Sequence, residues 1–241
     1  MLAPVVERAA LVAGLDGISH VAAGELLGTE ASGTMPHALM LCFGRGNQGE
    51  AFSAFNEAVS PDVPRVALCD TFSDEVEEVL EAISALGDDL SSVRIDTTGS
   101  RRGDFGHILR ELRWHLDSRG YDDVGIFASG GLGPNDLREL RDVVEGFGVG
   151  GAITSAPPVD FALDIVEREG ESISKRGKLP GVKQVYRTPE GGHHVALADC
   201  DGENGEALLE PLIVDGEIVR EFGLEAAKVR SKTDAATVFD A

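Results

Sequence analysis

Short apolar runs alternate with amphipathic segments through the middle of this sequence, and this alternation limits the possible folds more than any other feature. Apolar runs at 65–69, 92–96 and 124–128 predict buried strands. The segments between them, 74–86 and 104–118, carry apolar residues at helical spacing. Strands and helices that alternate at this spacing indicate a parallel sheet or barrel. We therefore expect an α/β fold.

Polar side chains gather where these strands end. In parallel α/β folds, the carboxyl ends of the strands form the edge at which ligands bind. The sequence therefore predicts a ligand site at this edge, built from Ser19, Thr34, Asp70, Thr71, Arg94, Asp96 and Ser129.

Two glycine-rich turns follow the last strands of the pattern. The first is Ser129-Gly130-Gly131, and the second contains Gly148, Gly150 and Gly151. Such turns expose backbone N–H groups that suit a phosphate, and the loops after the last two strands of a barrel are its usual phosphate site. Glycines that only form tight turns are the alternative. Two such turns, separated by one helix, favour the phosphate site.

His37 follows Pro36, which is typical of the first turn of a helix. A histidine there is either a capped surface residue or, at the ligand edge, a phosphate acceptor or general base. Arg101 and Arg102 are either a mobile phosphate clamp or exposed charge.

Arg94 and Asp96 are one residue apart on a predicted strand, so their side chains point the same way. One interpretation is a buried ion pair. The other is that Arg94 binds a carboxylate or phosphate as a planar fork while Asp96 binds a ribose hydroxyl or a metal-bound water. Asp70 and Thr71 allow the same role, or cap the helix that begins near residue 74.

The charge balance restricts the partners of the protein. The sequence has 42 acidic and 21 basic residues, a formal net charge of −21. This charge argues against nucleic-acid binding. Abundant acidic residues with scarce lysine resemble the composition of proteins from salt-loving archaea. Because molar salt shortens the Debye length to about 3 Å, the self-repulsion would be screened there.

The 241 residues suit one large domain or slightly more. We expect a barrel domain over 1–158 and a smaller strand-rich module over 159–241, with strands near 172–176, 183–187 and 194–198 and a frayed end. The three cysteines form no CxxC pair, which supports neither a zinc site nor a disulfide framework. No apolar run has membrane length, and the N-terminus lacks a signal-peptide pattern. A cytoplasmic protein is the default expectation.

Six elements in chain order resemble the nicotinate phosphoribosyltransferase family, most closely its archaeal form. They are Gly17-Ile-Ser-His-Val, Gly33-Thr-Met-Pro-His37, Asp70-Thr-Phe, Arg94-Ile-Asp-Thr-Thr-Gly-Ser100, the two glycine turns and Lys183-Gln-Val-Tyr-Arg187. The match spans about residues 7–187. His20 departs from the pattern, since many members have Asn there.

The resemblance implies a type II phosphoribosyltransferase: an incomplete (β/α) barrel, similar to a TIM barrel, with a small strand-rich sandwich domain. The implied reaction, EC 6.3.4.21 and formerly grouped with glycosyltransferases, joins nicotinate to 5-phosphoribosyl pyrophosphate in NAD salvage. Mg²⁺ and coupled ATP hydrolysis are implied. His37 matches the family's phosphorylated histidine, Arg94 and Asp96 match residues at the pyridine and ribose, and the glycine turns match the 5′-phosphate site.

Family members carry an N-terminal sheet domain and a first barrel segment before the Ala-Pro-x-x-Glu-Arg helix, which here begins at residue 3. We therefore expect that the N-terminal part is missing, and that the isolated chain exposes apolar surface and has weak activity or none. Completion by a second polypeptide is expected to restore the activity. The expected assembly is a homodimer or this completion by the missing N-terminal part. The alternatives are the related quinolinate enzyme, which needs more basic residues for a second carboxylate, and an inactive remnant that binds phosphoribosyl ligands.

Overall fold

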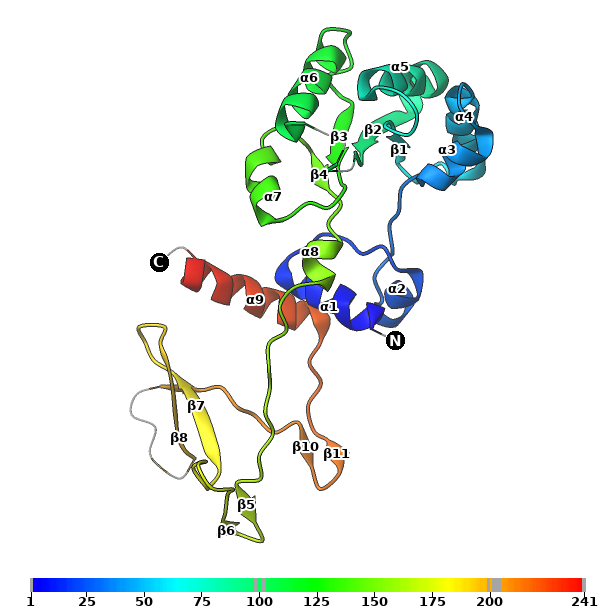
Figure 1. The fold of residues 1–241 in the computed structure, drawn as a ribbon. Coiled ribbons are helices and arrows are strands. Elements are labelled where there is room, and N and C mark those ends of the chain that lie inside the picture. Colours follow the sequence, from blue (N-terminus) through cyan, green and yellow to red (C-terminus); the bar gives the residue numbers. More distant parts are fainter. Residues whose placement is uncertain (1, 98, 101–102, 199, 201–204, 240–241) are drawn as a thin grey trace. The chain divides into compact units, whose positions relative to one another are not determined.

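The computed structural model describes residues 2–97, 99–100, 103–198, 200 and 205–239. The chain divides into two compact units, and Figure 1 labels elements of both. The first comprises residues 1–6 and Gly17–Ala156, and the second comprises Glu7–Asp16 and Pro157–Ala241. Helix α1 (Ala3–Ala13) contributes residues to both.

A parallel sheet forms the centre of the first unit, which confirms the α/β prediction. Its strands lie in the order β1 (Arg65–Leu68), β2 (Leu90–Ile95), β3 (Gly125–Ala128) and β4 (Gly146–Phe147). Each strand pairs in parallel with the next one along the chain. All the carboxyl ends therefore meet at one edge of the sheet.

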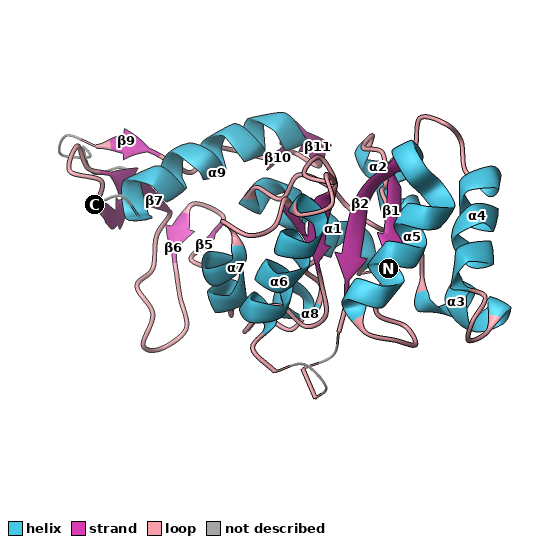
Figure 2. Cartoon of the chain, turned by 90° about the horizontal axis from the view of Figure 1, so that it is seen from above, coloured by secondary structure: helices cyan, strands magenta, loops and turns pink. Residues whose placement is uncertain are grey.

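The helices of this unit follow the predicted alternation. They are α2 (Val21–Leu27), α3 (His37–Phe43), α4 (Gln48–Ala58), α5 (Glu75–Leu86), the 3₁₀ turn η1 (Gly87–Asp89), α6 (Phe105–Asp117), α7 (Pro134–Leu140) and α8 (Gly151–Thr154). Side-chain caps fix three of the starts: His20 accepts from the Ala23 N–H, Asp74 from the Val76 N–H, and Asp104 from the His107 N–H. Helix α5 connects β1 to β2 and α6 connects β2 to β3, and both lie alongside the sheet in Figure 2.

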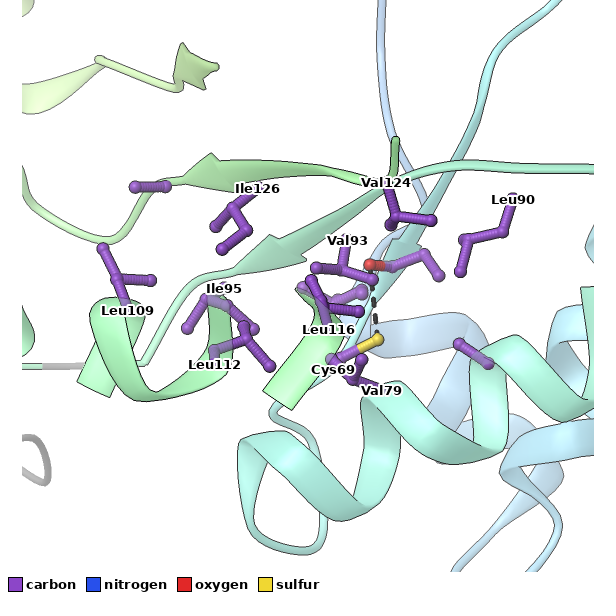
Figure 3. Packing of buried hydrophobic residues seen from close by; sticks show 14 of the residues in the cluster. Cys69, Val79, Leu90, Val93, Ile95, Leu109, Leu112, Leu116, Val124 and Ile126 are labelled. Carbon is purple, nitrogen blue, oxygen red and sulfur yellow. Dashed lines mark hydrogen bonds between the residues drawn. The ribbon is translucent and has the colours of Figure 1, made fainter. Parts of the chain in front are cut away.

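The core of the first unit lies between this sheet and its helices (Figure 3). Val93 and Ile95 of β2 and Ile126 of β3 are fully buried, and so are Leu109 and Leu112 of α6. Because side chains alternate along a strand, Arg94 must lie on the opposite face of β2 from Val93 and Ile95. The helix-covered face therefore provides most of the core, and Arg94 shares the other face with Leu68 and Phe127, its partners in the strand register.

The sequence of residues 17–21 also predicts a brief strand, and this prediction is wrong. Only an isolated bridge joins Ile18 to Ala31. The His20 side chain accepts a hydrogen bond from the Ala23 N–H, and α2 begins at Val21. His20 therefore caps a helix, and the residues after it are helical and cannot continue a strand.

The second unit contains short antiparallel strands and one long helix. Its elements are β5 (Glu167–Arg168), β6 (Glu171–Ser172), β7 (Lys183–Arg187), β8 (His193–Leu197), β9 (Glu206–Ala207), β10 (Ile213–Val214), β11 (Glu217–Ile218) and α9 (Leu224–Phe239). Strand β7 spans the predicted residues, and β8 lies within one residue of the prediction.

Two predictions for this unit are wrong. The strand expected at 172–176 ends at Ser172, and a turn follows it in which the Lys178 N–H donates to the Lys175 carbonyl at 3.1 Å and the Ser174 hydroxyl donates to the Lys178 carbonyl at 2.7 Å. The end expected to be frayed forms α9, which is rich in alanine and lysine, residues with high helix propensity. Before β5, the side chains of Val159, Phe161, Leu163 and Ile165 are all at least 75% exposed.

The net charge of −21 gives a prediction for stability. We expect the thermal unfolding midpoint to rise by several degrees between 0.1 M and 2 M KCl, because salt screens the repulsion between carboxylates. Calorimetry in KCl and in an equal osmolarity of sucrose separates screening from solute exclusion. A midpoint that falls in KCl would contradict this expectation.

Candidate active site

The carboxyl edge of the sheet brings together the polar residues that follow each strand. Asp70 and Thr71 follow β1, and Asp96 follows β2. Ser129 follows β3, where its N–H donates to the Ile95 carbonyl at 2.8 Å. Gly148 follows β4 and its N–H donates to the Ala128 carbonyl at 2.8 Å. The sheet ladder thus continues into the loops and fixes their backbone.

Arg94 is the centre of this cluster. Its guanidinium donates to Thr34 Oγ1 at 2.6 Å, to Asp96 Oδ2 at 2.7 Å and to Ser129 Oγ at 2.8 Å. The Arg94 and Asp96 side chains are each 22% exposed, so the pair is partly open to solvent. The ion pair of the first interpretation is therefore present but is not buried, and the guanidinium also links the loop containing Thr34 to β2 and to the turn after β3.

His37 begins α3, as predicted, and its ring faces the same edge. Its Nδ1 lies 3.1 Å from Thr71 Oγ1. Its Nε2 lies 3.7 Å from Asp70 Oδ1 and 3.7 Å from Asp96 Oδ2. With 39% of its side chain exposed, the imidazole is held on both sides and remains accessible to a substrate.

Asp70 is the most deeply buried carboxylate of the cluster, with 2% of its side chain exposed. Its Oδ2 accepts from the Asp96 N–H at 2.6 Å and from the Thr97 hydroxyl at 2.9 Å. Its Oδ1 is buried and accepts no hydrogen bond from the described residues. Asp74 caps α5, so Asp70 does not have the capping role that was its alternative. An unsatisfied buried carboxylate oxygen indicates a site prepared for a ligand or cation.

Burial raises the pKa of the Asp70 carboxyl above its ordinary value, and the hydrogen bonds from Thr97 and Asp96 and the nearby His37 only partly oppose this. A raised pKa means that the folded chain binds the proton more tightly than the unfolded chain. The contribution of Asp70 to the free energy of unfolding is therefore fully present below pH 3.8, the ordinary pKa of the carboxyl. It is lost as the pH rises through the raised pKa of the folded chain.

Asp70→Asn removes this titration. We expect the variant to gain stability relative to the wild type as the pH rises from 4 to 8, although it loses activity. Urea unfolding at several pH values measures the difference. Asp142→Asn, at a side chain that is 85% exposed, is the matched control and should show no such trend. A difference that does not change with pH would contradict the assignment.

The glycine turns approach the cluster closely. Gly130 has a φ of 93°, and a Cβ there would lie 2.9 Å from both the carbonyl oxygen and Oδ1 of Asp96. A Cβ on Gly148 would lie 3.0 Å from the Ser129 Cβ. Gly131 has a φ of 71° with open space around it. Gly150 and Gly151, at the start of α8, also face open space. Their role in phosphate binding stays a prediction.

Most of the predicted site residues therefore lie in one connected cluster. The contacts join His37, Thr34, Asp70, Thr71, Arg94, Asp96, Ser129 and Gly130. Ser19 lies next to the bridge at Ile18, before α2, and its role stays a prediction. Arg101 and Arg102 lie outside the described residues.

Two residues that support the cluster were missed. Thr97 is 5% exposed, and its hydroxyl lies 2.9 Å from both Asp70 and Glu75. Glu78, fully buried on α5, accepts from the backbone of the loop after Asp70. The available signal was a glutamate within the apolar stripe of a helix, four residues before Ala82.

Magnesium typically binds through one or two carboxylates, several waters and the phosphates of a substrate. Asp70, with its unsatisfied Oδ1, and Asp96 fit that donor set. Among the described residues, no group of three or more His, Cys, Asp or Glu side chains is arranged to hold a metal by itself. The residues present therefore suit a cation that arrives with a phosphorylated substrate.

The sequence matches the profile of the quinolinate phosphoribosyl transferase C-terminal domain over residues 1–164. The chain therefore belongs to this family of phosphoribosyltransferases. Among curated relatives, nicotinate phosphoribosyltransferase pncB2 of Mycobacterium tuberculosis is 34% identical over 251 aligned residues, which cover 95% of this chain and 52% of the relative. The pncB1 protein of the same organism is 32% identical, with coverages of 92% and 52%.

A solved structure, nicotinate-nucleotide pyrophosphorylase from Pyrococcus furiosus, superimposes with a TM-score of 0.89 at 49% identity. The match covers 100% of this chain and 63% of that one. The chain thus spans about half the length of the curated relatives that it matches. In the part of the chain that is described, no helix combines the length and apolar character needed to span a bilayer.

Proposed function

We propose that this chain carries the catalytic centre of a nicotinate phosphoribosyltransferase, which forms nicotinate mononucleotide and pyrophosphate in NAD salvage. The cluster around Arg94 is the observation that supports this most strongly. It joins the ends of β1, β2 and β3 with the start of α3 and leaves the buried Asp70 Oδ1 unsatisfied. The names of the M. tuberculosis relatives agree with this proposal.

The geometry suits transfer at a ribosyl carbon. Positive charge develops on the ribose as pyrophosphate leaves, and the Asp70 and Asp96 carboxylates are fixed close to where it would form. The turns at Gly130 and Gly148 would hold the 5′-phosphate through backbone N–H groups. Arg94 would bind the nicotinate carboxylate as a fork. The protein contributes mainly by positioning and by electrostatics.

We propose Mg²⁺ and ATP as the further requirements of the reaction. Asp70 and Asp96 would hold Mg²⁺, which would neutralise charge on the pyrophosphate. His37 would accept the terminal phosphoryl group of ATP on Nε2, with ADP as the leaving group, because the imidazole is partly exposed while its Nδ1 faces Thr71. The added negative charge next to two carboxylates would then favour release of pyrophosphate by repulsion.

The finer architecture is also part of the proposal. The sheet and its helices would form part of an incomplete barrel of the type II phosphoribosyltransferase kind, and the second unit would belong to a sandwich domain. We propose a cytoplasmic protein that works as a homodimer. Light scattering after size-exclusion chromatography measures the assembly.

Quinolinate is the second candidate substrate, because the matching family profile carries its name. Binding of quinolinate requires positively charged side chains for two carboxylates. In the described cluster, Arg94 is the side chain with a permanent positive charge. Mass spectrometry of the nucleotide formed from nicotinate or from quinolinate, each with 5-phosphoribosyl pyrophosphate, Mg²⁺ and ATP, separates the candidates. We expect product from nicotinate that increases with ATP. Product from quinolinate alone would overturn the proposal.

A further inference from the structure

Glu78 is a carboxylate inside the hydrophobic core. It lies on the face of α5 that also carries Val79 and Ala82, and its exposed fraction is 0%. A buried carboxylate is costly unless hydrogen bonds compensate it. Here three consecutive backbone N–H groups donate to it: Thr71 at 2.8 Å, Phe72 at 2.5 Å and Ser73 at 2.8 Å. Glu78 therefore holds the loop that follows Asp70.

This loop connects Glu78 to the candidate catalytic histidine. Thr71 donates its N–H to Glu78 Oε2 and places its hydroxyl oxygen 3.1 Å from His37 Nδ1. Asp70, directly before Thr71 in the chain, places Oδ1 3.7 Å from His37 Nε2. One edge of the imidazole thus faces Thr71, whose backbone N–H is bound by Glu78, and the other faces Asp70, the residue directly before Thr71.

The proposed reaction needs one tautomer of the ring. Because Nδ1 faces Thr71, the phosphoryl group would be accepted by Nε2, whose lone pair is available only when the proton of the neutral ring is on Nδ1. The Thr71 hydroxyl oxygen lies 3.1 Å from Nδ1 and can accept a hydrogen bond from it. This pairing requires Thr71 to stay in place, and Glu78 secures its backbone.

We propose that Glu78 is a positioning residue for His37, acting through Thr71. The effect of Glu78 on turnover rests on the proposed function, because only that function gives His37 a role in the reaction. The orientation and tautomer of the His37 ring, which are the structural part of the proposal, can be measured without turnover.

Glu78→Gln is the sharpest variant. The amide oxygen can still accept from Phe72 and Ser73, but the NH₂ group would face the Thr71 N–H, donor against donor. We expect kcat for nicotinate mononucleotide formation to fall about 10- to 100-fold, the range typical of residues that orient an active-site histidine. We expect KM values to change less than about threefold, since Glu78 is buried away from substrate. Glu77→Gln, the same charge change at an exposed neighbour, should match the wild type.

A double-mutant cycle with Thr71→Val tests the route. If Glu78 acts through Thr71, the two losses in kcat will be much less than additive. Fully additive losses would overturn the proposal. Glu78→Asp keeps the charge with a shorter reach, so we expect an intermediate kcat; it replaces Glu78→Gln in the cycle if the latter does not fold.

Nitrogen-15 NMR of the His37 ring separates this proposal from the proposed function. We expect the wild-type ring to show one dominant tautomer, and Glu78→Gln to shift toward a mixture. Identical ring spectra in the two proteins would overturn the positioning role, whether or not the wild type makes nucleotide. If the wild type makes no nucleotide but Glu78→Gln still changes the tautomer of the ring, the positioning role is supported and the proposed activity is refuted.

Discussion

Arg94→Lys is expected to lower kcat/KM for nucleotide formation by roughly 100- to 1,000-fold, the loss typical when an aligned charge-stabilising donor is removed. The guanidinium donates in three directions at once, to Thr34, Asp96 and Ser129. A lysine ammonium is a point charge on a flexible stem and cannot reproduce this planar arrangement. Steady-state kinetics with nicotinate and 5-phosphoribosyl pyrophosphate measures the loss.

Arg141→Lys is the matched control, because its side chain is 72% exposed and lies after α7. It should retain the wild-type rate. Thermal unfolding of both variants shows whether Arg94→Lys still folds. A folded Arg94→Lys variant with wild-type kinetics would show that Arg94 has only a structural role.

Gly130→Ala is expected to reduce activity by roughly 100-fold or more while the protein remains folded. A side chain at a φ of 93° is strained, at about 1–2 kcal/mol for a left-handed residue. The new Cβ would also lie 2.9 Å from Asp96 Oδ1 and from the Asp96 carbonyl oxygen. Asp96 would have to move, and its contact with Arg94 would be disturbed. Kinetics together with thermal unfolding measures both effects.

Gly120→Ala separates strain from collision. Gly120 has a φ of 82°, similar to that of Gly130, but its Cβ would meet nothing within 4 Å, and it lies between α6 and β3, away from the site. We expect a comparable loss of stability with activity retained. Equal losses of activity in both variants would mean that backbone strain alone, and not the approach to Asp96, accounts for the effect.

The first unit could be predicted from sequence because its strands are apolar and its helices amphipathic. Val93, Ile95 and Ile126 mark the strands, and the strand ends then place Asp70, Asp96 and Ser129 at one edge by topology alone. His37 followed from the helix start after Pro36. These inferences require only periodicity and the parallel arrangement.

The parts that sequence could not predict depend on local three-dimensional contacts. The role of Glu78 depends on a loop that folds back so that three N–H groups meet one carboxylate. The bridging position of the Thr97 hydroxyl depends on how Asp70 and Glu75 approach it. In the second unit, strands of two residues give too short a pattern for periodicity, and α9 has no strongly apolar face to identify it.

The central claim is that the edge of the sheet around Arg94 binds the phosphoribosyl substrate, and chemical-shift mapping tests it most directly. Titration of the nitrogen-15-labelled chain with 5-phosphoribosyl pyrophosphate and Mg²⁺ should perturb, in a saturable way, the amides of Gly130, Gly131 and Gly148 and the guanidinium of Arg94. The same titration of Arg94→Lys should require more ligand, because the Arg94 guanidinium holds Asp96 and Ser129 in place at this edge. Saturable shifts confined to other residues, or none at millimolar ligand, would contradict the claim.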